Sequence, residues 1–497
     1  MRTSSLAFGR RLPLALTVSS LLLATAASGS AATKVAAGTA SSPATNAYGP
    51  VAVGVPNLNL PNAKRAGGVD LYLPNRKAQR VTEQKLGLVG SGKGDFHRFG
   101  AATIVDQLNG DKYPDLVVGA PGLAARGAKG KVVVLFGSAK GITAKGAQVL
   151  SPGEVGDEFG ASMVLSGGVL YIGAPGHDSG GVGNAGGLYR YSLGAKGNAT
   201  AIDLLTQSLP ALGGVSQADQ RFGEVLAPGG DGVVIGLPNA LVGTAAGAGE
   251  MMMIHPGPTP AALTVETWSQ DSPGVPDTAE AGDHFGAAVT AGGHAVGVPG
   301  EDVGSIVDAG AVQTFVWDTF VDANLQPYTF ITQADPEVPG QAEPGDRFGA
   351  ALASGIFDSM ESISQAVGAP GEDVGTVTDA GSITLVGLPM VASDARYVGS
   401  SKLFQQGHGL PGTPEPGDAL GASLATVMGN GGFEETSFDS ILIGVPGEDV
   451  GTAKAHRNTG RAIIWNTSEY PTLSFGYSGG DLAGLKYGAN LASESAH

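Results

Sequence analysis

The chain has 497 residues, no cysteine and a formal net charge of −17 at pH 7. Without cysteine it can form neither disulfide bonds nor a cysteine-linked lipid anchor, and its acidic balance argues against nucleic acid and anionic lipid as partners. The 81 glycines and 30 prolines follow no three-residue period, which excludes a collagen-like chain and indicates many tight turns.

Residues 1–32 have the pattern of a secretory signal peptide. Arg2, Arg10 and Arg11 form its positive region, and a mostly apolar run over 12–27 leads to small residues that offer cleavage sites. A membrane anchor is the alternative, but serines interrupt the run and it is short for a bilayer span. Losing three arginines and no acid would change the net charge from −17 to −20. We expect a secreted, extracellular protein without a transmembrane segment in the mature chain, beginning with a flexible Ala/Ser/Thr-rich lead-in over residues 33–47.

Three motifs then recur seven times in one cyclic order. Aromatic-Gly pairs, with one Leu-Gly, begin at Phe99, Phe159, Phe222, Phe285, Phe348, Leu420 and Tyr487. Apolar runs end in Gly-x-Pro at Gly54, Gly119, Gly173, Gly236, Gly297, Gly368 and Gly444. A glycine followed by a short alternating strand comes third, as in residues 130–136. Successive aromatic-Gly pairs lie 60 to 72 residues apart. Repeats of this length, built of strands and turns, predict an all-β, seven-bladed β-propeller of four-stranded blades over residues 48–497.

The register of the repeats predicts how the ring closes. The first motif met along the chain is Gly-x-Pro at Gly54, and the last is the aromatic-Gly pair at Tyr487. Joined, the two incomplete repeats make one blade, so the segment after Tyr487 should pair beside residues 51–56 and leave no free sheet edge. We expect a monomer.

One repeat shows the expected strands. Strand A runs from Phe99 toward Val105, strand B is 115–119, strand C is 131–136 and strand D lies near 147–150. Antiparallel alternation places the A–B and C–D hairpins on one face of the disc, and the B–C loops and D–A crossovers on the other.

Carboxylates gather in the second set of loops. Crossovers carry Glu-x-Gly-Asp strings, such as Glu280 to Asp283 and Glu343 to Asp346. The B–C loops carry Gly-Glu-Asp-Val-Gly strings, whose candidate ligand-binding residues are Glu301, Asp302, Asp308, Glu372, Asp373, Asp379, Glu448 and Asp449. Two interpretations stay open: the acids bind a cation or a ligand, or they cap turns by accepting local backbone N–H groups in loops copied by duplication.

The ordered motifs resemble the FG-GAP repeats of the integrin α-chain propeller. The strings Pro-Gly-Glu-Asp-Val-Gly and Gly-Asp-x-Phe-Gly resemble still more those of secreted, integrin-like FG-GAP proteins of actinobacteria. The resemblance covers nearly all of residues 48–497. It implies a seven-bladed propeller, Ca²⁺ held in A–B hairpins, and ligands bound on the opposite face.

The resemblance also implies one candidate calcium site, because only the first complete repeat approaches the family signature Asp-x-[Asp/Asn]-x-Asp-Gly-x-x-Asp. The ligands would be Asp106, Asn109, Asp111, the carbonyl of Tyr113 and Asp115, an oxygen-rich set that suits a hard cation. Counted back from Asp115, however, the first ligand position is Gln107, and Lys112 replaces the glycine. The alternative is a hairpin held by Asx turns without metal.

Function is less specified by the sequence than fold. The chain contains no Gly-x-Ser-x-Gly elbow, HExxH motif or P-loop, and its eight histidines are scattered. The first hypothesis is a non-catalytic adhesion or binding protein whose acidic face meets an extracellular protein or glycan. The second is a secreted hydrolase, for example phosphodiesterase-like or phospholipase-like, with its site on that face or in the central shaft.

Overall fold

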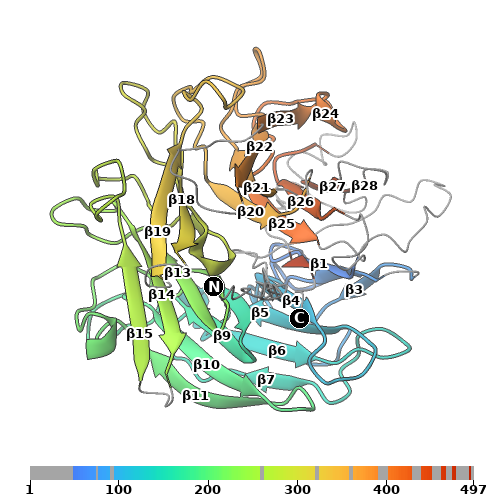
Figure 1. The fold of residues 1–497 in the computed structure, drawn as a ribbon. Coiled ribbons are helices and arrows are strands. Elements are labelled where there is room, and N and C mark those ends of the chain that lie inside the picture. Colours follow the sequence, from blue (N-terminus) through green and yellow to red (C-terminus); the bar gives the residue numbers. More distant parts are fainter. Residues whose placement is uncertain are drawn as a thin grey trace, which may run out of the picture.

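The computed structural model describes residues 49–73, 76–89, 94–257, 262–318, 324–357, 362–389, 401–427, 438–449, 460–465, 473–476 and 492–493. Its strands form seven sheets that follow one another around a ring (Figure 1). The predicted all-β, seven-bladed propeller is therefore confirmed. The proposed signal peptide and lead-in lie outside the described residues.

Blades are numbered here from the first complete repeat. In each of the first three, four consecutive antiparallel strands form one sheet. Blade 1 contains β4 (Ala102–Asp106), β5 (Asp115–Ala120), β6 (Lys131–Leu135) and β7 (Gln148–Leu150). Blade 2 contains β8 (Met163–Ser166), β9 (Val169–Ala174), β10 (Gly187–Leu193) and β11 (Ala199–Leu205). Blade 3 contains β12 (Val225–Gly229), β13 (Gly232–Leu237), β14 (Glu250–Pro256) and β15 (Leu263–Trp268).

The next three blades repeat this order. Blade 4 contains β16 (Ala288–Val289), β17 (Ala295–Val298), β18 (Ala311–Asp318) and β19 (Asn324–Ile331). Blade 5 contains β20 (Ala351–Gly355), β21 (Ser362–Ala369), β22 (Ser382–Pro389) and β23 (Ser401–Gln406), and the short β24 (Gly409–Leu410) adds a fifth strand parallel to β23. Blade 6 contains β25 (Ser423–Val427), β26 (Ser440–Val445), β27 (Arg461–Trp465) and β28 (Leu473–Gly476). Short 3₁₀ turns lie at Ala124–Arg126, Pro210–Leu212 and Ala291–Gly293, and the described residues contain no α-helix.

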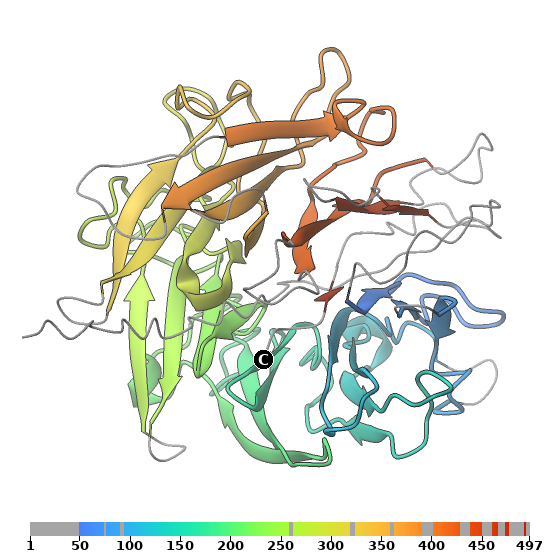
Figure 2. The same cartoon turned by 45° about the vertical axis from the view of Figure 1, so that its right-hand side comes forward.

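Blade 7 is built from both ends of the chain, as the register predicted. Strand β29 (Ala492–Ser493) pairs antiparallel with β1 (Val51–Gly54), and β2 (Val69–Tyr72) and β3 (Gln79–Val81) complete the sheet. The pairing matches Val51 with Ser493 and Ala52 with Ala492. Figure 2 shows the strands of blade 6 beside the blue strands of blade 7, and Val51 and Val53 pack against residues of β25, β26 and β27. The residues around Tyr487 lie outside the described part of the chain.

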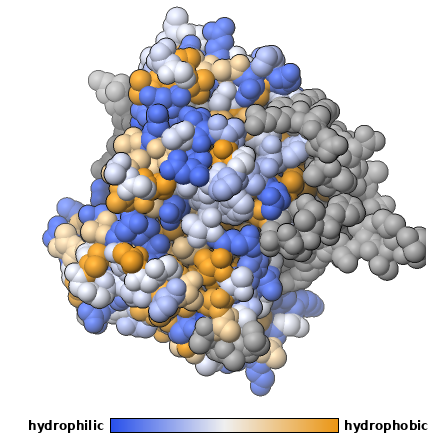
Figure 3. All heavy atoms as spheres, turned by 60° about the vertical axis from the view of Figure 1, so that its left-hand side comes forward, coloured by the Kyte–Doolittle hydropathy of each residue, from blue (hydrophilic) through white to orange (hydrophobic). Residues whose placement is uncertain are grey.

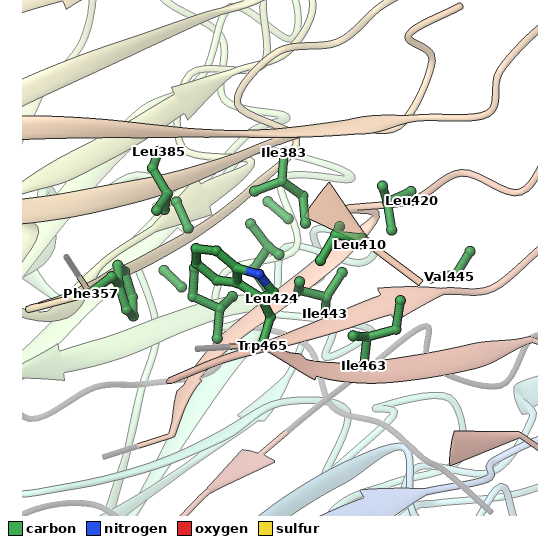
Figure 4. Packing of buried hydrophobic residues seen from close by; sticks show 14 residues of the cluster. Phe357, Ile383, Leu385, Leu410, Leu420, Leu424, Ile443, Val445, Ile463 and Trp465 are labelled. Atoms are coloured by element: carbon green, nitrogen blue, oxygen red, sulfur yellow. The ribbon is translucent and has the colours of Figure 1, made fainter. Parts of the chain in front are cut away.

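The hydrophobic core is divided among the blade junctions. Each of seven clusters of buried apolar side chains combines residues of two neighbouring blades. Figure 4 shows the cluster between blades 5 and 6, where Trp465 lies among Leu385, Leu424 and Ile443. Strands buried on both faces read as continuous apolar runs, which explains why β5 and β13 are buried along their whole length.

The aromatic-Gly pairs do not open the inner strands, so the prediction that strand A begins at Phe99 was wrong. Strand β4 begins at Ala102, three residues after Phe99. Phe99 instead forms an isolated parallel bridge to Gly67 of the preceding blade, and five further junctions repeat this bridge. The residue before the aromatic adopts a left-handed conformation, with φ of 55° at Arg98 and 58° at His284. That turn places the pair across the boundary between two blades.

Gly297 and Gly349 show why these crossings require glycine. The N–H of Gly349 donates to the carbonyl oxygen of Gly368 in its own blade, at 3.0 Å. A Cβ atom on Gly297, in the preceding blade, would lie 2.0 Å from the carbonyl oxygen of Gly349. The recurrence of glycine in the Gly-x-Pro and aromatic-Gly motifs thus reflects backbone contact between blades.

Candidate functional site

The B–C loops and the D–A crossovers lie on one face, as expected from strand alternation; we refer to them together as the loop face. The N–H of Gly300, in the B–C loop of blade 4, donates to the carbonyl of Asp283, in the crossover that enters the same blade. The N–H of Gly345, in the next crossover, donates to the carbonyl of Val307 in that loop. The B–C loop of blade 4 is therefore held between two crossovers.

Two of the predicted aspartates hold their own loops. Asp302 Oδ1 accepts the N–H of Asp308 at 2.9 Å, and Asp373 Oδ1 accepts the N–H of Asp379 at 3.0 Å. Both N–H groups belong to residues in the left-handed region, with φ of 52° and 51°. These bonds support the turn-capping interpretation for Asp302 and Asp373. The side chains of Asp308 and Asp379 are exposed and are available to a partner.

The three predicted glutamates do not form part of the exposed surface. Glu301, Glu372 and Glu448 are only 6–7% exposed. A glutamine from the preceding blade donates to each of them: Gln270 to Glu301 and Gln333 to Glu372, each at 2.6 Å, and Gln406 to Glu448. Asp449, which follows the last glutamate, is half-buried.

Sequence reasoning missed these three glutamines. A signal existed, because the D strand in several repeats is followed by a Ser-Gln or Thr-Gln pair, as at Gln270 and Gln333. Glutamine beside serine or threonine is common in loops, however. Only the fold shows that these glutamine side chains contact a buried carboxylate of the next blade.

The crossover aspartates are buried beside the glutamates. Oδ2 of Asp283, Asp346 and Asp418 accepts the backbone N–H of the glutamate three residues earlier, at 2.6–2.8 Å. Burial raises the pKa of Asp346 to about 6 and that of Asp418 to about 7. Burial and then the charge of Asp277 raise the pKa of Glu301 to about 8, and burial raises the pKa of Glu372 to about 7. Buried carboxyl groups with raised pKa values therefore lie beneath the loop face.

The predicted calcium residues lie together on the hairpin between β4 and β5. Asp106 and Asp115 face each other across the ladder, and the turn between them carries Asn109, Asp111 and Tyr113. Their carboxylate oxygens accept hydrogen bonds from nearby backbone groups. Asp115 accepts the N–H groups of Leu108 and Gly137, and Asp111 accepts that of Tyr113.

The amide of Gln107 occupies the middle of this turn. Its Nε2 donates to the carbonyl oxygens of Asp111 and Tyr113, and its Oε1 accepts the N–H groups of Asn109 and Gly110. The Tyr113 carbonyl is the oxygen that the calcium signature would use. In this conformation the donor set does not fit a calcium ion, and no group of three or more His, Cys, Asp or Glu side chains suited to a metal occurs among the described residues. Calcium binding at this hairpin stays a prediction.

We expect Gln107→Asp to introduce or strengthen a calcium response at this hairpin. The change removes the amide donor and restores the acidic first ligand of the signature. The measurement is the shift in melting temperature on adding Ca²⁺, which should be larger than the wild-type shift in Gln107→Asp and return to the wild-type shift in Gln107→Asp/Asp111→Ala. Equal shifts in wild type and both variants would show that Ca²⁺ does not bind these residues.

Exposed apolar side chains also gather on the loop face. Among the described residues, six large hydrophobic side chains are well exposed, and five of these lie in B–C loops or crossovers: Val155, Leu209, Val215, Leu241 and Val307. Val307 is 54% exposed and directly precedes the exposed Asp308. Figure 3 shows on one side of the molecule that hydrophobic and hydrophilic residues alternate over the surface. Mixed apolar and charged loops on a rigid scaffold are typical of contact surfaces.

Comparisons with known proteins add little beyond this geometry. No protein-family model matches the chain, and no curated protein matches it either. The Dos1 propeller is one of the solved structures that resemble it, with 9% sequence identity, coverage of 74% of this chain and 72% of that chain, and a TM-score of 0.30. So low a TM-score carries no argument here, and the propeller assignment rests on the strand order. In the described ranges no helix has the length and apolarity needed to cross a membrane.

Proposed function

We propose that this protein is a secreted, integrin-like FG-GAP propeller that binds an extracellular protein or glycan through its loop face. The observation that carries the proposal is the placement of exposed Asp308 and Asp379 on the same face as most of the well-exposed apolar side chains. Acids spread for solubility alone would not need to share a face with apolar residues.

The FG-GAP assignment has separate support. The aromatic-Gly pairs and the Gly-x-Pro glycines contact each other at six blade junctions. The motifs that carry the resemblance are therefore the residues that join the blades. A secretory route is supported by the pattern of residues 1–32.

The test is to neutralise the loop-face aspartates once a partner has been captured from the medium or the cell surface. The variant is Asp302→Asn, Asp308→Asn, Asp373→Asn and Asp379→Asn together. Asparagine keeps an oxygen acceptor, so the loop hydrogen bonds to residues 308 and 379 should persist. We expect at least a tenfold loss of affinity with an unchanged melting temperature.

The matched control is Asp111→Asn, on the opposite face. Full affinity in the loop-face variant, combined with a loss in the control, would place the contact on the A–B hairpins instead. The hydrolase hypothesis is tested in parallel with phosphodiester and phospholipid substrates. Turnover that disappears in the loop-face variant would favour the enzyme over the binder.

A further inference from the structure

The junctions entering blades 4, 5 and 6 share three buried polar positions. They are a glutamine at or just after the end of the D strand, an aspartate two residues before the first residue of the next aromatic-Gly or Leu-Gly pair, and a glutamate two residues after the Gly-x-Pro proline. At the junction entering blade 5 these residues are Gln333, Asp346 and Glu372, and Ser382 begins strand C beside them; all four are at most 6% exposed. Gln333 donates to Glu372, and Asp346 and Ser382 lie close enough to influence the ionisation of Glu372.

Three blade junctions contain their own positive group. Entering blade 1, Lys131 Nζ lies 2.5 Å from Glu83 Oε1, and His97 contacts the same carboxylate. Entering blade 2, His177 lies 3.3 Å from Asp157. Entering blade 6, Arg461 lies 3.0 Å from Glu448. Arg461 is the first residue of its strand C, the position that Ser382 takes in blade 5.

The junctions entering blades 4 and 5 lack such a group. Each has two buried carboxyls, Asp283 with Glu301 and Asp346 with Glu372, and among the described residues no Lys, Arg or His forms an ion pair with any of the four. Buried acceptors there also lack partners. Oδ1 of Asp346 and Oε1 of Gln333 make no hydrogen bond, although these side chains are 1% and 3% exposed, and Oε1 of Gln270 is in the same state. The equivalent oxygens of Asp418 and Gln406 also make no hydrogen bond, so the junctions entering blades 4 and 5 differ from that entering blade 6 in lacking a positive group. Leaving a buried acceptor without a partner destabilises the folded state.

We propose that the junction entering blade 5 binds a divalent hard cation, Ca²⁺ or one of similar chemistry, through Asp346, Glu372 and Gln333, and that the junction entering blade 4 does so through Asp283, Glu301 and Gln270. Two carboxylates and an amide oxygen are hard oxygen ligands. The ion would supply the charge that Lys131, His177 and Arg461 supply elsewhere, and would satisfy the unpartnered oxygens. Both sites are separate from the β4–β5 hairpin, which lies at the other end of the blades.

The alternative occupant is a proton. Burial raises the pKa of Glu372 to about 7 and that of Asp346 to about 6, so the pair would otherwise retain a proton near neutral pH. A protonated Asp346 could itself donate to an amide oxygen, so the response of stability to Ca²⁺, compared with its response to pH, distinguishes the two occupants.

The experiment measures the melting temperature of the full mature chain at pH 7.5 after chelation and again with saturating Ca²⁺. We expect a rise of about 3 °C or more in wild type. Asp346→Asn and Ser382→Arg should each lose about half of that rise, because the first places an N–H donor and the second a guanidinium where the ion would bind. Should Ser382→Arg fail to fold, the nearly isosteric Asp346→Asn still tests the site.

The reciprocal change is Arg461→Ser, which removes the built-in cation from the junction entering blade 6. We expect this variant to be destabilised in chelator and to show a larger Ca²⁺-induced rise than wild type. Asp111→Asn, on the hairpin, should leave the rise unchanged. No rise in wild type, or a full rise in Asp346→Asn and Ser382→Arg with loss in Asp111→Asn, would overturn the proposal. The same holds if stability responds to pH but not to Ca²⁺, since the clusters would then hold protons.

Discussion

Deleting residues 484–497 is expected to destabilise the whole ring by about 3–5 kcal/mol. Strand β29 is the inner strand of blade 7, and its loss leaves β1 with an unpaired edge toward the shaft. Strand β1 supplies Val51 and Val53 to the cluster shared with blade 6 and Ala52 to the cluster shared with blade 1. Fraying of β1 would therefore loosen two junctions at once.

The measurement is denaturant unfolding of the truncated chain beside the intact mature chain. Removal of residues 33–47, which the sequence predicts to be a flexible lead-in, is the control and should change stability by less than about 0.5 kcal/mol. An unchanged unfolding midpoint after deletion of residues 484–497 would contradict the role assigned to the closing strand.

Gly297→Ala should be among the most damaging single substitutions in the protein, costing more than about 4 kcal/mol. The added Cβ would lie 2.0 Å from the carbonyl oxygen of Gly349. Relief would require the backbones of two blades to separate, and this would open the apolar cluster between them.

Gly183→Ala is the matched control for this prediction. Gly183 lies in the B–C loop of blade 2, and a Cβ there would meet only Asp178 Oδ1, at 3.9 Å. We expect its effect on the free energy of unfolding to stay within about 1 kcal/mol. If the two alanine variants unfold at the same denaturant concentration, the close contact between Gly297 and Gly349 does not limit stability.

Much of the fold could be predicted because the motifs report backbone geometry. The apolar run before Gly119 predicted strand β5 to within one residue. The register of the repeats predicted that the strand containing Val51 pairs with the C-terminal segment. The start of strand A was misplaced because Phe99 looks like the first apolar residue of an alternating strand. Its neighbour Arg98 adopts a left-handed conformation, which no propensity of arginine indicates.

The candidate site was less predictable. Adjacent acids such as Glu301 and Asp302 look alike in a loop sequence, yet the first is buried beside the crossover that enters its own blade and the second is exposed. Their difference depends on contacts between blades, such as the bond from Gln270, that are distant in sequence. Likewise, the hairpin at Asp111 has ligand-type residues in nearly the right order, but a single glutamine amide fills its centre.

The crossing of each aromatic-Gly pair between blades has a consequence for how the ring can change in size. Consider a unit that runs from one Phe-Gly pair to the next. Its aromatic-Gly pair contacts the preceding blade, and its Gly-x-Pro glycine contacts the following blade, as Gly297 contacts Gly349. When such a unit is copied or lost, every new junction still brings together two matching halves. Blade number can then vary by recombination without new interfaces having to be invented, which fits the near-identical loops at Glu301 and Glu372.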